Sequence, residues 1–276
     1  MPEGDTIYRA ARTLNLALAG QVVTAFETVL PNLARVDVDS TIAGRAMEKV
    51  EARGKWLLMY LSGDLILLTH MLMNGSWHIY RLGETWRCRR GDMRIVLTTE
   101  KILAVAFRVP IAEFHTSRSL LRSRGFNRLG LSILDTQFDE MEMVTRVRSC
   151  VDYEIGDALL KQSVLSGIGN VYKSELCFAC GVNPFRLVRS MSLDEVKCVV
   201  SEARKFMLAN VAETSGDRIV TYTGMRRTTR SADPTNRLWV YQRKGEPCRR
   251  CRSSIEARKQ GLDARITFWC PQCQMM

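Results

Sequence analysis

The sequence predicts an α+β protein with an N-terminal antiparallel β-sandwich and a flanking helix, followed by a helical domain that ends in a zinc-ribbon β-hairpin. Three observations predict this fold class. Short apolar runs follow one another closely between residues 22 and 107, which is typical of antiparallel sandwiches and barrels. Helical periodicity then dominates residues 139–207. Two Cys-x-x-Cys pairs close the chain, as in zinc ribbons.

The N-terminal region is predicted to open with a helix over Asp5–Ala19, because apolar residues recur there at helical spacing and Gly20 follows as a stop signal. The pattern then changes to β-like runs, and Ser62-Gly63-Asp64 has the composition of a hairpin turn. The expected strands are Gln21–Leu30, Trp56–Leu61, Leu65–His70, Trp77–Arg81, Met93–Thr98 and Ile102–Phe107.

The segment Ser117–Leu134 is rich in Arg, Ser and Gly and is interpreted as a linker to a helical region. Ser192-x-x-Glu195 is a capping box that opens the longest helix, and Thr214–Asn236 has the composition of a loop. Shorter helices are predicted at Asp139–Ser149, Glu154–Ser163 and Val171–Cys180. We therefore expect three domains, at residues 1–131, 132–235 and 236–276.

The composition indicates a cytoplasmic protein without a membrane segment. No apolar run reaches the roughly 18 residues that a spanning helix requires, and the N-terminus lacks a basic start followed by an apolar core. The net charge is +11, and residues 218–276 carry thirteen Lys or Arg against four Asp or Glu. This excess favours a phosphate-bearing partner; a merely solvated basic face is the alternative.

The four C-terminal cysteines are the strongest spacing signal in the chain. Eighteen residues separate the two Cys-x-x-Cys pairs, which is the spacing of a four-cysteine zinc ribbon. Disulfides are the weaker alternative in a chain without a secretory signal. The expected zinc ligands are Cys248, Cys251, Cys270 and Cys273. Another pair, Cys177 and Cys180, falls in a helical pattern, where we expect packed apolar thiols and give a metal or redox role second place.

The first residues indicate nucleophilic chemistry. Removal of Met1 exposes the secondary amine of Pro2 beside the carboxylic acid of Glu3. An α-amino group has an unperturbed pKa of about 7.7–8, against about 10.4 for lysine, so far more of it is unprotonated at neutral pH. A secondary amine that attacks an aldehyde-like carbon forms an iminium, and a neighbouring carboxylic acid exchanges the protons that such covalent catalysis requires.

Two motifs have the composition of anion-binding sites. Gly167-Ile168-Gly169-Asn170 lies between two helical segments, where it would turn backbone amides toward an anion, and Lys173 follows one turn later. A structural helix–turn–helix corner is the equal alternative. Lys55, in Arg53-Gly54-Lys55, precedes a strand, where a lysine is usually solvated.

The stretch His70–Gly75 follows an apolar strand and ends in a turn. Leu72 and Met73 in this turn have the long apolar side chains that wedge into a base stack. Packing in a core is the commoner alternative for such residues, and His70 is itself more often a core histidine than a catalyst.

Together these motifs resemble the bacterial formamidopyrimidine-DNA glycosylase / endonuclease VIII family of base-excision repair enzymes. The similarity spans the chain, and its separate motifs stand in the order that is usual in the family. They are Pro2-Glu3-Gly4, Arg53-Gly54-Lys55, the helix–two-turns–helix signature at residues 167–175, Val240-Tyr241, and the zinc hairpin from Pro247 to Cys273.

The resemblance implies a monomeric DNA glycosylase and abasic-site lyase that acts on damaged double-stranded DNA by β,δ-elimination. It implies one structural Zn²⁺ and no small-molecule cofactor. By this resemblance Pro2 attacks C1′ of the damaged nucleotide, Glu3 is its acid–base partner and Lys55 engages a phosphate. The implied DNA contacts are phosphate binding by Asn170, Arg265 and Lys173, and filling by Leu72 or Met73 of the gap that the flipped-out nucleotide leaves.

The departures from the family pattern concern specificity. The opening Gly4-Asp5-Thr6 is similar to endonuclease VIII, which favours oxidised pyrimidines, so we expect a pyrimidine enzyme. The His70–Gly75 stretch leans toward the formamidopyrimidine branch, and Phe107-Arg108-Val109-Pro110 replaces a segment that supplies two further gap-filling residues there. An oxidised-purine glycosylase is the alternative within the class. A non-catalytic zinc-ribbon DNA-binding protein is the alternative outside it, but such a protein needs neither the amine nor the acid.

Overall fold

The structure is a computed structural model that describes residues 2–123, 125–212, 228–229 and 237–275. Among these, the residues up to Asn127 form one compact unit and those from Arg128 onward form a second. The hairpin that we expected as a separate domain therefore shares a unit with the helices. Nearly all of the loop predicted at Thr214–Asn236 lies outside the described residues. Within the described ranges, no helix is long and apolar enough to cross a membrane.

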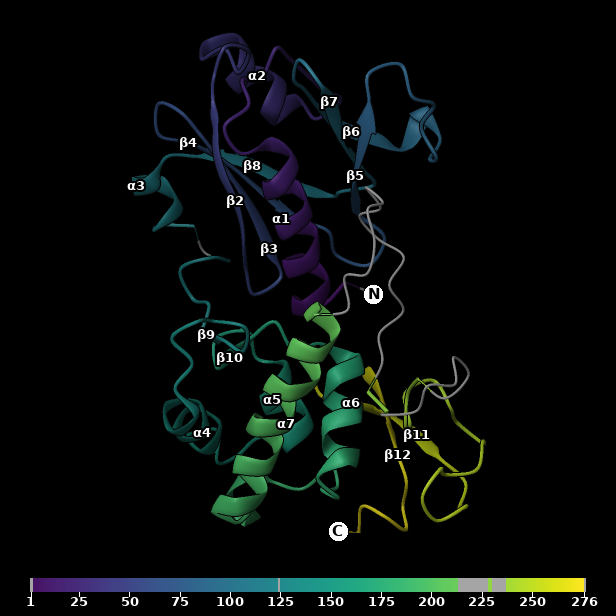
Figure 1. The fold of residues 1–276 in the computed structure, drawn as a ribbon. Helices are drawn as coiled ribbons and strands as arrows, with labels where there is room; N and C mark the ends of the chain where they lie inside the picture. The colour runs from purple at the N-terminus through teal and green to yellow at the C-terminus, as the bar shows by residue number, and fades with distance from the viewer. Residues whose placement is uncertain (1, 124, 213–227, 230–236, 276) are drawn as a thin grey trace. The chain divides into compact units, whose positions relative to one another are not determined.

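The first unit is a sandwich of two four-stranded antiparallel sheets with α1 beside it (Figure 1). The sheets have the strand orders β2-β3-β4-β8 and β1-β6-β7-β5. Its elements are α1 (Gly4–Leu18), β1 (Ala25–Thr28), α2 (Pro31–Asp39), β2 (Met47–Arg53), β3 (Trp56–Leu61), β4 (Leu65–His70), β5 (Ser76–Arg81), η1 (Arg90–Asp92), β6 (Met93–Thr98), β7 (Ile102–Phe107), β8 (Ile111–His115) and α3 (Ser117–Leu120).

One hydrophobic core joins both sheets to α1. Leu14 of α1, Leu57 of β3 and Ile95 of β6 are fully buried members of it. Strands β3, β4, β6 and β7 have the bounds that the sequence predicts, and β5 begins one residue earlier. The sequence did not reveal β2 and β8, nor α2 and α3. In β2, charged residues interrupt the apolar ones, and the register shifts between Met47 and Lys49. The strand expected at Gln21–Leu30 covers only Ala25–Thr28 in the structure, and α2 begins at Pro31.

The second unit is helical and ends in a two-stranded hairpin. Its elements are β9 (Leu131–Ser132), α4 (Glu140–Arg148), α5 (Ile155–Leu160), β10 (Leu165–Ser166), α6 (Asn170–Ala179), η2 (Val188–Ser190), α7 (Leu193–Ala212), β11 (Glu256–Gln260) and β12 (Arg265–Trp269). The predicted capping box opens α7: the Glu195 N–H donates to Ser192 Oγ at 3.2 Å, and the Ser192 N–H donates to Glu195 Oε2 at 2.8 Å. Both hydrogen bonds satisfy amides that the first turn of a helix leaves free.

The hairpin β11–β12 packs on α6 through a small core of its own, which includes Phe178 of α6 together with Val240, Ile255 and Phe268. This packing explains why the hairpin and the helices form one unit.

The cysteines of α6 differ from the prediction at one position. Cys177 is buried, as expected for a packed thiol, but Cys180 forms a disulfide with Cys198 of α7. The prediction of two packed thiols is therefore wrong for Cys180. Sequence spacing could not show this bond, because core packing is what brings α6 and α7 together.

Candidate active site

Pro2 and Glu3 are buried at the start of α1. Glu3 is the N-cap residue, and its carbonyl accepts the N–H groups of Thr6 at 3.0 Å and Ile7 at 3.1 Å. The residue is 0% exposed, an uncommon environment for a carboxyl group. The positive end of the helix dipole favours an acid at this place. The first turn of α1 therefore holds a carboxyl group out of water next to the proline.

The turn that carries Lys55 lies at the same end of the sandwich. Two hydrogen bonds set α1 antiparallel to β2: the Gly20 N–H donates to the Met47 carbonyl at 2.8 Å, and the Val50 N–H donates to Asn15 Oδ1 at 2.7 Å. From the Asn15–Val50 contact, α1 runs back about 16 Å to its first residue. From the same contact, β2 runs forward about 10 Å to its last residue. Both segments lead to one edge, where Lys55 follows β2 as a half-buried side chain.

The turn after β4 reaches the same edge, because His70 pairs with Trp56 across β3 and β4. Met71 is fully buried, whereas Leu72 is 45% and Met73 is 54% exposed. The turn is tight: a Cβ at Gly75 would lie 2.6 Å from the Met71 carbonyl oxygen, so a side chain cannot be placed there. Leu72 and Met73 are therefore exposed, as the side chains of a base-stack wedge would have to be. Met71 is the residue of this turn that packs in the core.

His70 connects the Lys55 turn to the protruding loop. Its ring meets Trp56 edge-on at 4.8 Å between centroids, and its Nδ1 accepts the Leu72 N–H at 3.1 Å. Burial, with a smaller effect of the Lys55 charge, lowers the pKa of His70 to about 4. The ring is therefore neutral at physiological pH, which leaves Nδ1 free to accept this bond.

His70→Gln should weaken the acid sensitivity of the fold. Unfolded histidine takes up a proton near pH 6.5, but folded His70 resists it until about pH 4. The unfolded state therefore binds more protons in this window, and stability falls as the pH decreases from 6.5 toward 4. Urea unfolding at intervals between pH 7.5 and 4.5 measures the effect. The variant should show a flatter profile, and an unchanged slope in His70→Gln would contradict the assignment.

In the second unit, the first turn of α6 meets the hairpin. Asn170 Nδ2 donates to the Ile266 carbonyl at 2.8 Å, which sets Asn170 beside the strand that begins with exposed Arg265. At the hairpin tip, Gly261 has a φ of +67°, and a side chain there would collide with Asp157 of α5. The structure therefore places Asn170 next to the start of β12, where Arg265 lies.

Lys173 is in a different environment from the one predicted. The residue is 0% exposed, and its Nζ donates to Thr267 Oγ1 at 2.5 Å. Burial is the main cause that lowers the pKa of Lys173 to about 8. A phosphate ligand needs its ammonium group at the surface, so this position does not support the phosphate contact that the sequence suggested for Lys173.

Glu175 is a functional candidate to which the sequence motif gave no role. Its fully buried carboxylate accepts the backbone N–H groups of Trp239, Val240 and Tyr241 at 2.7, 2.9 and 2.9 Å, and also accepts the Thr228 hydroxyl. Burial raises the pKa of Glu175, and these hydrogen bonds oppose the increase. One acid thus holds the chain that leads into the hairpin. A carboxylate at an inward-facing helix position was the signal that could have revealed it.

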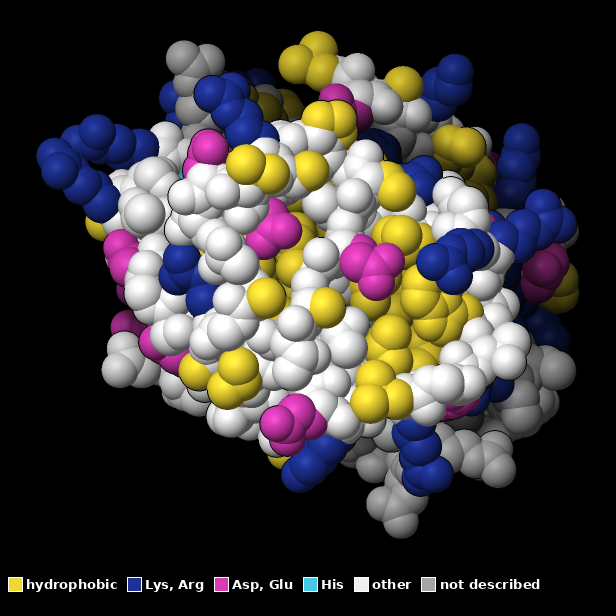
Figure 2. All heavy atoms as spheres, turned by 90° about the horizontal axis from the view of Figure 1, so that it is seen from above, with side chains coloured by type: hydrophobic (Ala, Val, Ile, Leu, Met, Phe, Trp, Pro, Cys, Tyr) yellow, Lys and Arg dark blue, Asp and Glu magenta, His cyan; other side chains and the backbone are white. Residues whose placement is uncertain are grey.

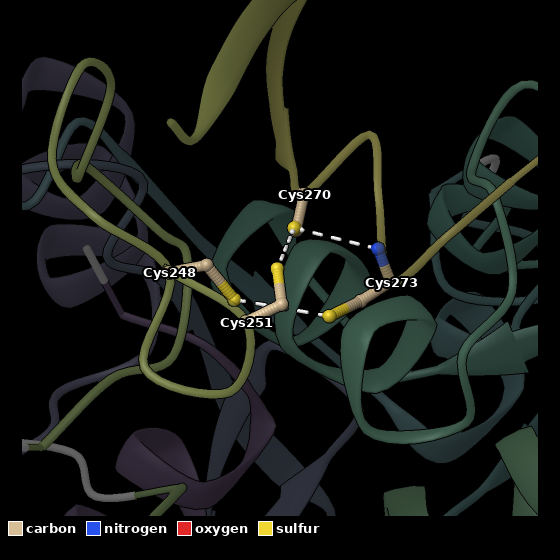
Figure 3. A group of neighbouring side chains, drawn as sticks. All are labelled: Cys248, Cys251, Cys270 and Cys273. Carbon is tan, nitrogen blue, oxygen red and sulfur yellow. Dashed lines mark hydrogen bonds between the residues drawn. The ribbon is translucent and has the colours of Figure 1, made fainter. Parts of the chain in front are cut away.

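The four C-terminal cysteines converge on one point (Figure 3). Their sulfur atoms all lie within 4.8 Å of one another, with 3.9 Å between Cys248 and Cys273 and 3.4 Å between Cys251 and Cys270. Sulfur atoms around a tetrahedral zinc ion, with Zn–S bonds of about 2.3 Å, are about 3.8 Å apart. The Arg250 N–H also points to Cys248 Sγ at 3.4 Å. This geometry fits one metal ion with four thiolate ligands.

Some arginines of the basic C-terminal region are held by aromatic rings. The Arg250 guanidinium lies 4.4 Å from the centre of the Phe178 ring and also donates to the Phe178 carbonyl at 3.1 Å. Arg258 lies 3.8 Å from the centre of the Phe185 ring. These contacts hold the two guanidinium groups against aromatic rings, while both residues stay exposed. Lys and Arg side chains also lie around the rim of the face that Figure 2 shows.

Two family models match the chain in the order of its two units. Residues 1–110 match the formamidopyrimidine-DNA glycosylase N-terminal domain, and residues 129–221 match the formamidopyrimidine-DNA glycosylase H2TH domain. Among solved structures, a complex of Lactococcus lactis Fpg with DNA that contains an abasic site aligns with a TM-score of 0.82 and 20% identity, over 99% of this chain and 100% of that one. That likeness shows a common fold.

Curated relatives align over nearly the whole chain. "Probable endonuclease 8 2" of Streptomyces coelicolor is 38% identical over 99% of this chain and 94% of its own length. "DNA-(apurinic or apyrimidinic site) lyase Nei2" of Mycolicibacterium smegmatis is 32% identical, over 99% of both chains. Because the identity is this high over the full length, and the fold and motifs agree, the chain belongs to the formamidopyrimidine-DNA glycosylase / endonuclease VIII family of bifunctional DNA glycosylases and abasic-site lyases.

Proposed function

We propose that the protein removes oxidised pyrimidines from double-stranded DNA through Pro2 and then cuts the strand by β,δ-elimination. The observation that carries this proposal is the buried Glu3 carboxyl at the start of α1, next to the proline and at the edge that also bears the Lys55 turn. Relatives named as endonuclease 8 and as an abasic-site lyase support the two activities. The similarity of Gly4-Asp5-Thr6 to endonuclease VIII supports the pyrimidine preference.

The proposed reaction uses the amine and the acid in turn. The Pro2 nitrogen attacks C1′, and the base leaves with a proton that Glu3 supplies or relays. The sugar ring then opens: the C1′–O4′ bond breaks, O4′ takes up a proton through Glu3, and an iminium forms between C1′ and the Pro2 nitrogen, which has lost its own proton. The iminium acidifies C2′, so that loss of the C2′ proton expels the 3′ phosphate. A second elimination along the conjugated system then expels the 5′ phosphate. Lys55 stabilises the negative charge on a phosphate beside the reacting sugar.

The remaining residues hold DNA in the shape that this chemistry needs. A base inside a duplex must be flipped out at a cost of a few kcal/mol, and Leu72 or Met73 would replace its stacking. Asn170 and Arg265 would bind flanking phosphates without reading sequence. Cys248, Cys251, Cys270 and Cys273 would hold Zn²⁺, which supplies a structural cross-link when bound.

Borohydride trapping on a duplex with an abasic site tests the covalent step. Wild-type protein without Met1 should form a reduced protein–DNA adduct. Pro2→Gly should lose it, because a primary amine gives an imine that can shed its proton and become a weaker electron sink. Mass spectrometry of the N-terminus and circular dichroism serve as controls. A correctly processed wild-type protein that binds DNA but forms no adduct would favour the non-catalytic DNA-binding alternative.

Lesion preference is tested by single-turnover cleavage of duplexes that contain thymine glycol or 8-oxoguanine. The proposal expects faster removal of thymine glycol. Faster removal of 8-oxoguanine would identify the protein as the oxidised-purine enzyme, with the same Pro2 chemistry.

A further inference from the structure

Lys173 belongs to a buried chain of polar side chains between the helices and the hairpin. From Lys173 Nζ the chain continues through Thr267 Oγ1, which donates to Gln260 Oε1 at 2.6 Å. Gln260 Nε2 in turn donates to Glu154 Oε2 at 2.8 Å and to the Pro184 carbonyl at 2.8 Å. Lys173, Thr267 and Gln260 are each no more than 4% exposed. Every hydrogen bond of this chain joins the hairpin to the helical part of the unit or one hairpin strand to the other.

A charged group at this position calls for an explanation beyond stability. Removing an ammonium from water is costly, and an apolar side chain of similar volume usually packs a core at least as well as a buried charge. Buried polar groups are best attested as devices that specify register. The register of β12 is the property that this chain can specify.

The register of β12 decides where Arg265 points. Side chains two residues apart in a strand share a face, so Thr267, which Lys173 binds, lies on the same face as Arg265. Across the hairpin, Gln260 pairs with Arg265. A slip of one residue would turn Arg265 to the opposite face and away from its place beside Asn170.

We propose that Lys173 is a positioning residue that fixes the register of the hairpin through Thr267 and Gln260, so that Arg265 stands beside Asn170 to bind a DNA phosphate. Lys173 itself touches no phosphate. This inference rests on the proposed function, because it assumes that Arg265 binds the DNA backbone.

The salt dependence of DNA binding tests the inference in a double-mutant cycle. The probe is a duplex with a tetrahydrofuran abasic analogue, which cannot form an adduct with Pro2. Loss of one phosphate contact lowers the slope of log K against log salt by about 0.9. Lys173→Met and Arg265→Ala should each show this loss together with a roughly tenfold weaker affinity. The double variant should show no further loss, because Lys173 acts through Arg265. A doubled loss of slope in the double variant would mean that Lys173 binds a phosphate directly and would overturn the proposal.

Two substitutions at Thr267 provide a second route if Lys173→Met fails to fold. Thr267→Val keeps the shape and removes the hydroxyl group, so it should reproduce the lower slope. Thr267→Ser restores the hydroxyl group and should restore the slope. Wild-type affinity in Thr267→Val would contradict the proposal. Lys205→Met, which removes an exposed charge from α7, is the matched control and should leave the slope unchanged.

The result of the double-mutant cycle can be distinguished from a failure of the proposed function. A wild-type protein that binds the analogue but gives no borohydride adduct on a true abasic site would refute the proposed catalysis. The cycle would still show whether Lys173 positions Arg265.

Discussion

Glu3→Gln is expected to slow the removal of an oxidised base by about 10²–10⁴-fold, the usual contribution of a general acid or base. The amide has nearly the shape of the acid but cannot donate or accept a proton at physiological pH. Glu3 is buried at the N-cap of α1, directly after the proposed nucleophile. Single-turnover kinetics on a thymine glycol duplex measures the effect.

Binding of the tetrahydrofuran duplex by Glu3→Gln should remain close to wild type, because the substitution changes proton transfer and leaves the phosphate contacts intact. Glu48→Gln, at an exposed position of β2, is the matched control and should cleave at the wild-type rate. If Glu3→Gln released the base as fast as wild type, Glu3 would have no role in proton transfer and the proposed mechanism would fail.

Removal of the metal is expected to abolish specific DNA binding. A structural four-cysteine zinc site contributes on the order of 10 kcal/mol to the folding of small zinc domains, whereas the apolar core that joins the hairpin to α6 is small. Without the ion the hairpin should unfold and take Arg265 with it. A strong chelator, or Cys270→Ser, should therefore raise the Kd for the tetrahydrofuran duplex by at least about two orders of magnitude.

Zinc analysis and far-ultraviolet circular dichroism should report the loss of the ion and of the hairpin together. Added Zn²⁺ should restore binding to the chelated protein, and Mg²⁺ should not, because thiolates select softer metals. Cys150→Ser, at a buried cysteine away from the cluster, should keep its metal and its affinity. Full affinity after complete loss of the metal would show that the cysteine cluster has no part in DNA binding.

The sequence predicted most reliably where a local pattern carries the information. The bounds of β3 and β4 follow from apolar runs around a Gly63 turn, and the start of α7 follows from its capping box. Strand β2 escaped prediction because the register shift between Met47 and Lys49 breaks the period of two, so that Met47 and Val50 are both buried although they are three residues apart. Its pairing with β3 makes it a strand.

In the candidate site, too, the sequence predicted local features correctly and missed those that depend on distant segments. The sequence located the protruding Leu72 and Met73, since a turn after a strand is a local feature. It gave Lys173 a phosphate contact, because this lysine follows the anion-binding motif by one helical turn, and such a contact needs an exposed ammonium group. In the structure the strand that begins with Arg265 covers that position. Burial depends on what packs above a residue, and no spacing within α6 reports it.

By itself the sequence determined the chemistry available to this protein: a proline amine beside an acid, four cysteines at metal-binding spacing, and an excess of positive charge near the C-terminus. Such features depend on neighbours a few residues apart. Only the tertiary structure decided which polar groups lose contact with water and find each other. Lys173 meets a hydroxyl group 94 residues away, and Gln260 meets a carboxylate 106 residues away. Such pairs form because the fold removes water from them together, and that requires the complete chain.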